Sequence, residues 1–81
     1  MTKDQIYERI VQILKDTFDI DAQIVTPQAR LYDDLEIDSI DVVDLMDEVQ
    51  RHTGQKVTPE DFHSVRTVGD LVTVMQRLLR P

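Results

Sequence analysis

The stretch Asp33-Asp34-Leu35-Glu36-Ile37-Asp38-Ser39-Ile40-Asp41 marks the point at which a long loop gives way to a helix. Five acids surround one serine, and the apolar residues that follow Ser39 recur at helical spacing. Eight acids lie between residues 31 and 50, and no Lys or Arg stands among them. The sequence therefore predicts that Ser39 lies at or just before the first turn of an acidic helix.

The predicted acidic helix begins at Asp38 or Ser39 and ends near Gly54. Asp38 suits the cap position, with Asp41 three residues later, and Gly54 suits the residue just past the helix end. Its side chains divide into a core stripe and a second face that mixes apolar and acidic residues. The core stripe consists of Val42, Leu45, Met46 and Val49, and the second face consists of Ile40, Asp41, Val43, Asp44, Asp47 and Glu48.

Three further helices are predicted from apolar periodicity and capping signals. The first spans about residues 3–17 and follows Thr2, which has Gln5 three residues later as in a capping box. A short helix starts with Thr58 as its cap, and the last helix follows Thr67. No strand pattern appears. The fold class is therefore all-α: a four-helix bundle with three longer helices, one short helix and a long loop between helices one and two.

The long loop covers residues 19–37 and has no sustained period. A loop of this length needs anchors in a compact domain. Thr26 with Pro27 can start a single helical turn. The residues expected to point inward and anchor the loop are Ile24, Val25, Leu31, Leu35 and Ile37.

The composition limits the class of protein. Eighty-one residues allow one domain, residues 1–81, which buries about 60% of its unfolded surface. The net charge of −7 repels nucleic acids and anionic membranes, and it attracts basic protein patches. No apolar run approaches the length of a membrane span, no signal peptide pattern is present, and there is no cysteine. We therefore expect a cytoplasmic monomer without a disulfide or a thiolate metal site.

The sequence contains no motif typical of a catalytic site or of a metal site. A serine at a helix start is most often only a cap, no Gly-x-Ser-x-Gly motif is present, and His52 and His63 fit capping or surface positions. If the acidic stretch is aligned as a calcium loop from Asp34, Ser39 and Leu45 fall where glycine and glutamate are required. We therefore predict no catalytic residue and no metal ligand.

Residues 35–41 resemble the phosphopantetheine attachment motif of acyl carrier proteins, usually Asp-Ser-Leu with an apolar residue upstream. The resemblance extends through the first helix, the long loop, the acidic helix, Thr58-Pro59 and the Val-Arg-Thr-Val of residues 65–68. It implies that a phosphopantetheinyl transferase attaches 4'-phosphopantetheine to Ser39, with Asp38 and Ile40 as motif neighbours. The chain would then carry acyl groups as thioesters and would not itself be an enzyme. A phosphodiester on Ser39 would also lie at a helix N-terminus, where free N–H groups and the helix dipole favour negative charge.

The resemblance also implies that the acidic helix docks partner enzymes through basic patches on their surfaces. Those partners would be ketosynthase, acyltransferase, reductase and dehydratase type enzymes of fatty-acid or polyketide-type biosynthesis. Some core residues are candidate walls for a growing acyl chain, although a packed core needs the same residues. The implied docking residues are Asp38, Ile40, Asp41, Val43, Asp44, Asp47 and Glu48, and the candidate walls are Val42, Met46, Val65, Leu71 and Val72.

Three features depart from the familiar fatty-acid carriers. Ile40 replaces the usual Leu after the serine, Asp47 stands where an apolar contact is usual, and Gln50-Arg51-His52 lacks the usual acids. They suggest a dedicated pathway, and residues 28–35 resemble carriers from aryl-polyene or related polyketide-type lipid clusters. Two alternatives stay open: a peptidyl or aminoacyl carrier, and an unmodified acidic helical module that binds a basic partner.

Overall fold

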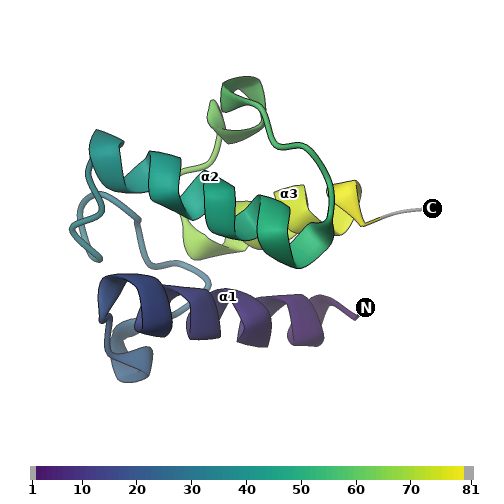
Figure 1. Cartoon of the computed structure of the whole chain (residues 1–81). Coiled ribbons are helices and arrows are strands. Elements are labelled where there is room, and N and C mark those ends of the chain that lie inside the picture. Colours follow the sequence, from purple (N-terminus) through teal and green to yellow (C-terminus); the bar gives the residue numbers. More distant parts are fainter. Residues whose placement is uncertain (1, 80–81) are drawn as a thin grey trace.

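The computed structural model describes residues 2–79 of the chain. Three α-helices carry the fold: α1 (Lys3–Phe18), α2 (Ser39–Thr53) and α3 (Val68–Leu78). Two 3₁₀ segments, η1 (Ala22–Ile24) and η2 (Pro59–Phe62), lie in the connections. Figure 1 shows α2 crossing above α1, with α3 behind α2. Among the described residues no β-strand forms, which confirms the all-α prediction, and no helix is long and apolar enough to cross a membrane.

The ends of the helices follow from their capping residues. α1 begins with the predicted capping box, in which Thr2 Oγ1 accepts a hydrogen bond from Gln5 N at 3.2 Å. α3 begins with the same reciprocal arrangement between Thr67 and Asp70. α2 ends at Gly54, whose φ of 68° is the left-handed conformation predicted for that position.

One hydrophobic core joins the three helices. α1 and α3 each contribute an apolar stripe at helical spacing. From α2, Leu45 and Val49 are fully buried, whereas Val42 and Met46 are half-buried at the edge of the core, so the predicted core stripe is confirmed. The buried helical residues elsewhere are Ile6, Ile10, Ile13 and Leu14 on α1, and Val68, Leu71, Val72, Val74 and Met75 on α3.

The long loop between α1 and α2 is fixed to the start of α3 by main-chain hydrogen bonds. Leu31 N donates to Arg66 O at 2.9 Å, and Val68 N donates to Ala29 O at 3.0 Å. These bonds satisfy backbone groups that a loop would otherwise leave unpaired. They also hold the segment that leads into α2, and so they help to position Ser39.

The anchors predicted in the loop are buried with one exception. Ile24 is 53% exposed, so its predicted inward placement is wrong. The cause is the tight turn of η1, closed by a bond from Val25 N to Ala22 O at 3.2 Å, in which neighbouring side chains point to different sides. The helical turn predicted at Thr26 is instead a reverse turn closed by Ala29 N. The buried anchors are Val25, Leu31, Leu35 and Ile37.

The predicted short third helix is a 3₁₀ segment of 4 residues, so the structure has three α-helices rather than four. Its hydrogen bonds join residues three apart, as between His63 N and Glu60 O at 3.1 Å. At its start, Asp61 Oδ2 accepts from Thr58 N at 2.8 Å. So few residues cannot close successive α-helical turns, but they suffice to bury Phe62.

Candidate functional site

Ser39 is the first residue of α2, as the sequence predicts, and it is exposed. Asp38 precedes it as the N-cap in an extended conformation, with φ −90° and ψ −176°. The side-chain hydrogen bonds at this helix start are made by Asp38 and Asp41, and within residues 2–79 they leave the Ser39 hydroxyl unused. A hydroxyl in this position can enter the active site of another protein.

Asp38 and Asp41 cap α2 reciprocally. Asp38 Oδ1 accepts from Ile40 N at 3.0 Å and from Asp41 N at 2.9 Å, and Asp41 Oδ2 accepts from Asp38 N at 3.4 Å. These bonds correct one part of the sequence interpretation, because Asp38 already occupies the amides that were expected to be free for a phosphodiester. The helix dipole still favours negative charge at this end.

A phosphate esterified to Ser39 would therefore find two amides of the first turn of α2 already bonded to Asp38. The carboxylates of Asp38 and Asp41 repel it, and the amides of Ile40 and Asp41 have no hydrogen left to donate to it. The site thus fits a covalently attached arm on an exposed serine. It does not fit a tightly bound free anion.

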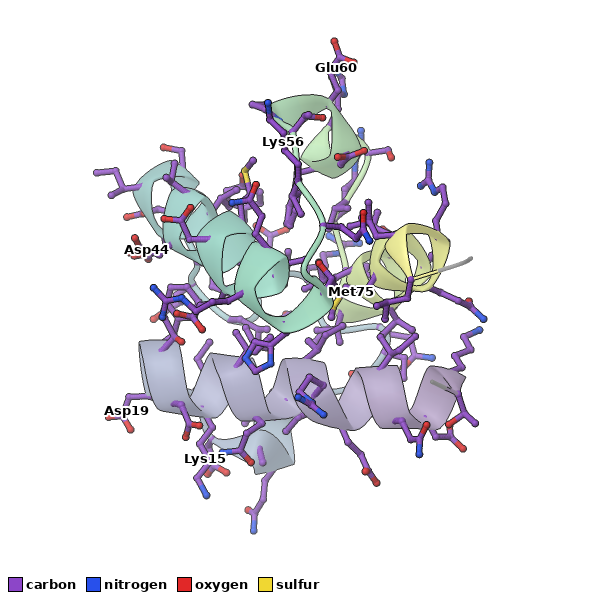
Figure 2. The ribbon with its side chains drawn as sticks, turned by 45° about the vertical axis from the view of Figure 1, so that its right-hand side comes forward. Lys15, Asp19, Asp44, Lys56, Glu60 and Met75 are labelled. Carbon is purple, nitrogen blue, oxygen red and sulfur yellow. The ribbon has the colours of Figure 1, made fainter. Side chains whose placement is uncertain are left out.

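The outer face of α2 presents two apolar side chains among carboxylates. Ile40 is 75% exposed and Val43 is 57% exposed. Asp44 and Asp47 are also exposed, and Figure 2 shows Asp44 on the side of α2 that faces away from α3. Because residues three and four apart share one side of a helix, these groups form one outward surface that begins beside Ser39.

The C-terminal end of α2 is built differently. Glu48 is half-buried, and its Oε1 accepts from Arg51 Nη1 at 3.2 Å. His52 Nε2 lies 3.9 Å from Glu48 Oε2, while His52 Nδ1 lies 3.4 Å from Arg9 Nη1 on α1. Sequence reasoning missed this link because its partners are 43 positions apart and no local pattern marks them. Of the predicted docking acids, Glu48 is thus the one that forms an ion pair with a cationic side chain, that of Arg51.

The acids of the loop have structural partners of their own. Asp34, the first residue of the calcium loop that the sequence failed to match, uses Oδ2 to accept from Arg30 N at 2.8 Å. Asp33 pairs with Arg30 Nη1 at 3.4 Å. Within the part of the chain that the structure describes, no group of three His, Cys, Asp or Glu side chains is arranged to hold a metal ion.

The candidate walls for an acyl chain fall into two groups. Val65, Leu71 and Val72 are buried in the core, and Val42 and Met46 are half-buried at its edge. Ordinary core packing accounts for all five positions.

Comparison with known proteins places this site in a family. The model of the phosphopantetheine attachment site family matches residues 8–75, which include the loop, Ser39 and all of α2. Acyl carrier protein 2 of Ralstonia nicotianae is 49% identical over 79 residues, which cover 98% of each chain. The chain belongs to the acyl carrier proteins. Among other acyl carrier proteins, the meromycolate extension acyl carrier protein of Mycobacterium leprae is 35% identical over 78 residues, covering 96% of this chain and 68% of the relative.

The fold agrees with that of a solved acyl carrier protein. The structure of the acyl carrier protein from Enterococcus faecalis superposes with a TM-score of 0.73 at 33% identity, covering 93% of this chain and 95% of the other. The helices and the loop that position Ser39 are thus arranged as in a family member.

As an acyl carrier protein, the chain is a carrier and not an enzyme, and the cofactor of its family is phosphopantetheine. Membership of the family implies interaction with a phosphopantetheinyl transferase and with biosynthetic enzymes. When bound, the cofactor supplies the thiol that carries the acyl group, and this sequence has no cysteine of its own. The exposed hydroxyl of Ser39 fits the covalent attachment that such a cofactor requires.

Proposed function

We propose that Ser39 is the attachment residue and that the protein carries acyl intermediates as thioesters on its phosphopantetheine arm. The observation that carries this proposal is the exposed Ser39 hydroxyl at the first position of α2, free of hydrogen bonds within the described residues. Ser64 is the other serine of the sequence, and it is also exposed, but it lies in the turn after η2 with no acidic helix behind it. Residues 1–81 act as one carrier domain, since a single core cluster reaches from α1 to α3.

Intact-protein mass spectrometry tests the attachment residue. After co-expression with a broad-range phosphopantetheinyl transferase, the wild type is expected to gain the mass of one phosphopantetheine. Ser39→Ala is expected to gain nothing, while Ser64→Ala, the matched control, gains the same mass as the wild type. A modified Ser39→Ala protein would refute the assignment, and an unmodified wild type would favour the alternative of an acidic interaction module.

The outer face of α2 is proposed as the docking surface for partner enzymes. Its exposed Ile40 and Val43 offer an apolar centre, and Asp38, Asp41, Asp44 and Asp47 surround this centre with charge; Glu48 extends the face toward Arg51. An apolar centre with a charged rim is the usual construction of a protein interface. Complementary basic patches on a partner would act mainly on the rate of encounter.

Charge reversal tests this surface. Asp44→Lys is expected to slow transferase modification and acyl transfer several-fold at low salt, and the difference is expected to shrink as salt is added. Glu60→Lys makes the same charge change on η2, away from α2, and is expected to react at the wild-type rate. If both variants react like the wild type at low salt, the acidic face is not the docking surface.

The proposed setting is a cytoplasmic monomer in fatty-acid or polyketide-type biosynthesis. Ketosynthase, acyltransferase, reductase and dehydratase type enzymes would be its partners. Ile40, Asp47 and the Arg51-His52 end of α2 favour a dedicated pathway, such as one resembling aryl-polyene synthesis, over the housekeeping one. Loading the modified protein with acyl or with aminoacyl donors separates this function from that of a peptidyl or aminoacyl carrier.

A further inference from the structure

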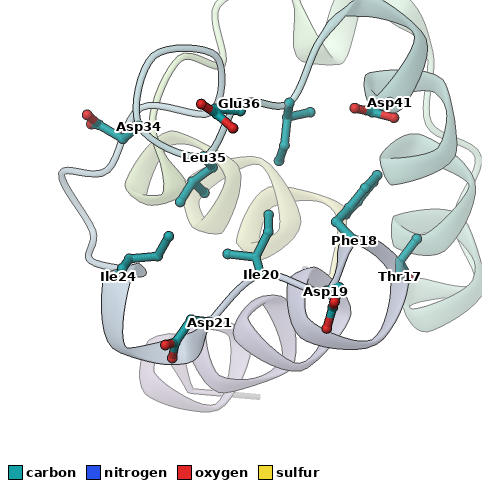
Figure 3. A pocket seen from close by; sticks show the side chains of 11 residues that line it. Thr17, Phe18, Asp19, Ile20, Asp21, Ile24, Asp34, Leu35, Glu36 and Asp41 are labelled. Atoms are coloured by element: carbon teal, nitrogen blue, oxygen red, sulfur yellow. The ribbon is translucent and has the colours of Figure 1, made fainter.

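A groove of about 590 Å³ opens between the end of α1, η1 and the loop that precedes α2 (Figure 3). Asp41, in the first turn of α2, lines the groove and also belongs to the proposed docking face. The groove and that face therefore meet at Asp41, two residues after Ser39 in the chain.

Part of the groove's lining is apolar, although polar atoms supply more of its surface. Ile24 is 53% exposed and Phe18 is half-buried, while Ile20 and Leu35 beside them reach into the core. Figure 3 shows Ile20, Ile24 and Leu35 directed toward one another across the hollow. Ile24 is one of only four large apolar side chains exposed among the described residues, and more than half of its surface is open to solvent. Burial of such a side chain by a partner is favourable, at about 25 cal/mol for each Å² of apolar surface removed from water.

The rim of the groove is purely anionic. Its five carboxylates belong to Asp19, Asp21, Asp34, Glu36 and Asp41, and no Lys or Arg lines it. The ion pairs formed within residues 2–79 involve Asp33 and Glu48 and none of these five. The rim therefore carries negative charge without an ion-pair partner around these apolar side chains, and a concave surface concentrates that potential.

We propose that this groove is a second docking surface, which receives a partner-enzyme segment that carries an aliphatic or aromatic side chain flanked by Lys or Arg. The apolar side chain would cover Ile24 and Phe18, and the basic side chains would neutralise the rim. A partner that engages both this groove and the outer face of α2 contacts two adjoining surfaces that share Asp41, in the same helical turn as Ser39, and so restricts how that turn is presented to the partner. The inference rests on the proposed function only in taking the partner to be an enzyme that acts on the arm.

Titration with a synthetic peptide tests the groove independently of the arm. The protein is the full chain carrying Ser39→Ala, labelled with nitrogen-15. The probe is a short peptide with one leucine flanked on both sides by lysines and arginines. The expected result is a set of amide shifts at residues 18–24 and 34–37. Shifts confined to α2 would overturn the proposal. Mass gain on Ser39 is measured separately, so failure of either test is distinguishable from failure of the other.

Three variants and one control peptide sharpen the result. Ile24→Ser removes the exposed apolar contact, and Asp19→Asn removes one rim charge while keeping a residue that tolerates the left-handed backbone. Each is expected to weaken peptide binding several-fold. Asp16→Asn removes the same charge from the exposed side of α1 outside the groove and is expected to leave binding unchanged. If an all-lysine peptide binds as tightly as the leucine peptide, or if Mg²⁺ alone displaces the leucine peptide at a similar concentration, binding is due to charge attraction alone. Either result would overturn the proposal.

Discussion

Asp38 and Asp41 bracket Ser39 and cap the same helix end through each other's backbone. Asp38 Oδ1 lies 2.9 Å from Asp41 N, and Asp41 Oδ2 lies 3.4 Å from Asp38 N. The two acids that bracket Ser39 therefore stabilise the helix that Ser39 begins, apart from any contact with a partner. A substitution at either position changes stability and docking together unless the replacement preserves the cap.

The two roles of Asp38 can be separated by a pair of variants. Asp38→Ala loses the cap and is expected to lower the free energy of unfolding by about 1 kcal/mol. Asp38→Asn keeps an oxygen that can accept from Ile40 N and Asp41 N, so its stability is expected to stay close to that of the wild type. Thermal unfolding measures both, since 1 kcal/mol shifts Tm by roughly 4–8 °C in a domain of this size. Equal losses in both variants would mean that the charge, and not the cap, matters.

The left-handed backbone of Glu36 predicts a stabilising substitution. Its φ of 56° is unfavourable for a residue with a Cβ atom, so Glu36→Gly is expected to raise the free energy of unfolding by up to about 1 kcal/mol. Glu36→Gln keeps the Cβ atom and removes only the charge, and it is expected to have little effect. Urea unfolding compares the two. A similar gain in both would assign the effect to charge repulsion in the acidic loop.

At Gly54, a left-handed residue that is already glycine, the opposite substitution is expected to destabilise the fold. Gly54 has a φ of 68°, and a Cβ atom built there would meet nothing within 4 Å, so the cost of Gly54→Ala comes from the backbone alone. That cost is expected to be about 1 kcal/mol. Urea unfolding checks it, and a neutral Gly54→Ala would show that the end of α2 relaxes out of the left-handed conformation.

Truncation of the buried side chains of α3 is expected to lower the stability of the fold strongly. Leu71 is fully buried and Met75 is 1% exposed, so Leu71→Ala and Met75→Ala are each expected to cost about 2–5 kcal/mol. Thr73→Ala, on the exposed side of the same helix, is expected to stay within about 0.5 kcal/mol of the wild type. Chemical unfolding monitored by circular dichroism measures all three. Small effects at both core positions would contradict the assignment of this stripe to the core.

Acid unfolding reports on Asp70. The N–H of Arg66, which donates to Asp70 Oδ2 at 3.1 Å, holds the pKa of this carboxyl below its ordinary value, and Thr67 adds further hydrogen bonds. Because the folded pKa is lower than the unfolded one, the ionised carboxylate stabilises the fold above the unfolded-state pKa of about 3.9, and this contribution is lost as pH falls through the folded pKa. Asp70→Asn is therefore expected to be less stable than the wild type near pH 7, with a difference that shrinks below about pH 4. Urea midpoints across that range measure it, and a constant difference would refute the assignment.

The sequence predicts those parts of the fold whose signals are local. The capping pairs of Thr2 with Gln5, and of Thr67 with Asp70, lie three residues apart, so helix starts could be read directly. Apolar periodicity likewise identified the stripe of α2 that enters the core. The short third helix was misjudged because its capping residues look the same for a 3₁₀ turn as for an α-helix.

Properties that depend on tertiary placement could not be predicted from the sequence. Ile24 and Val25 are equally apolar neighbours, and only the turn of η1 decides which of them faces inward. The sequence indicated Asp38 as a cap, but only the geometry shows that this cap uses two of the amides at the start of α2 that a phosphate could otherwise contact. The groove at Asp41 combines residues from α1, η1 and the loop, and no stretch of sequence contains it.

The backbone bonds between the long loop and the start of α3 make these two segments one cooperative unit. Three backbone amides donate hydrogen bonds between these two segments, those of Leu31, Val68 and Gly69. The Gly69 amide donates to Pro27 O at 2.8 Å. The three amide hydrogens should therefore exchange with solvent through a shared opening event, at closely matched rates. A force that a partner applies to the loop would then also loosen the start of α3, although α2 separates these two segments in the chain.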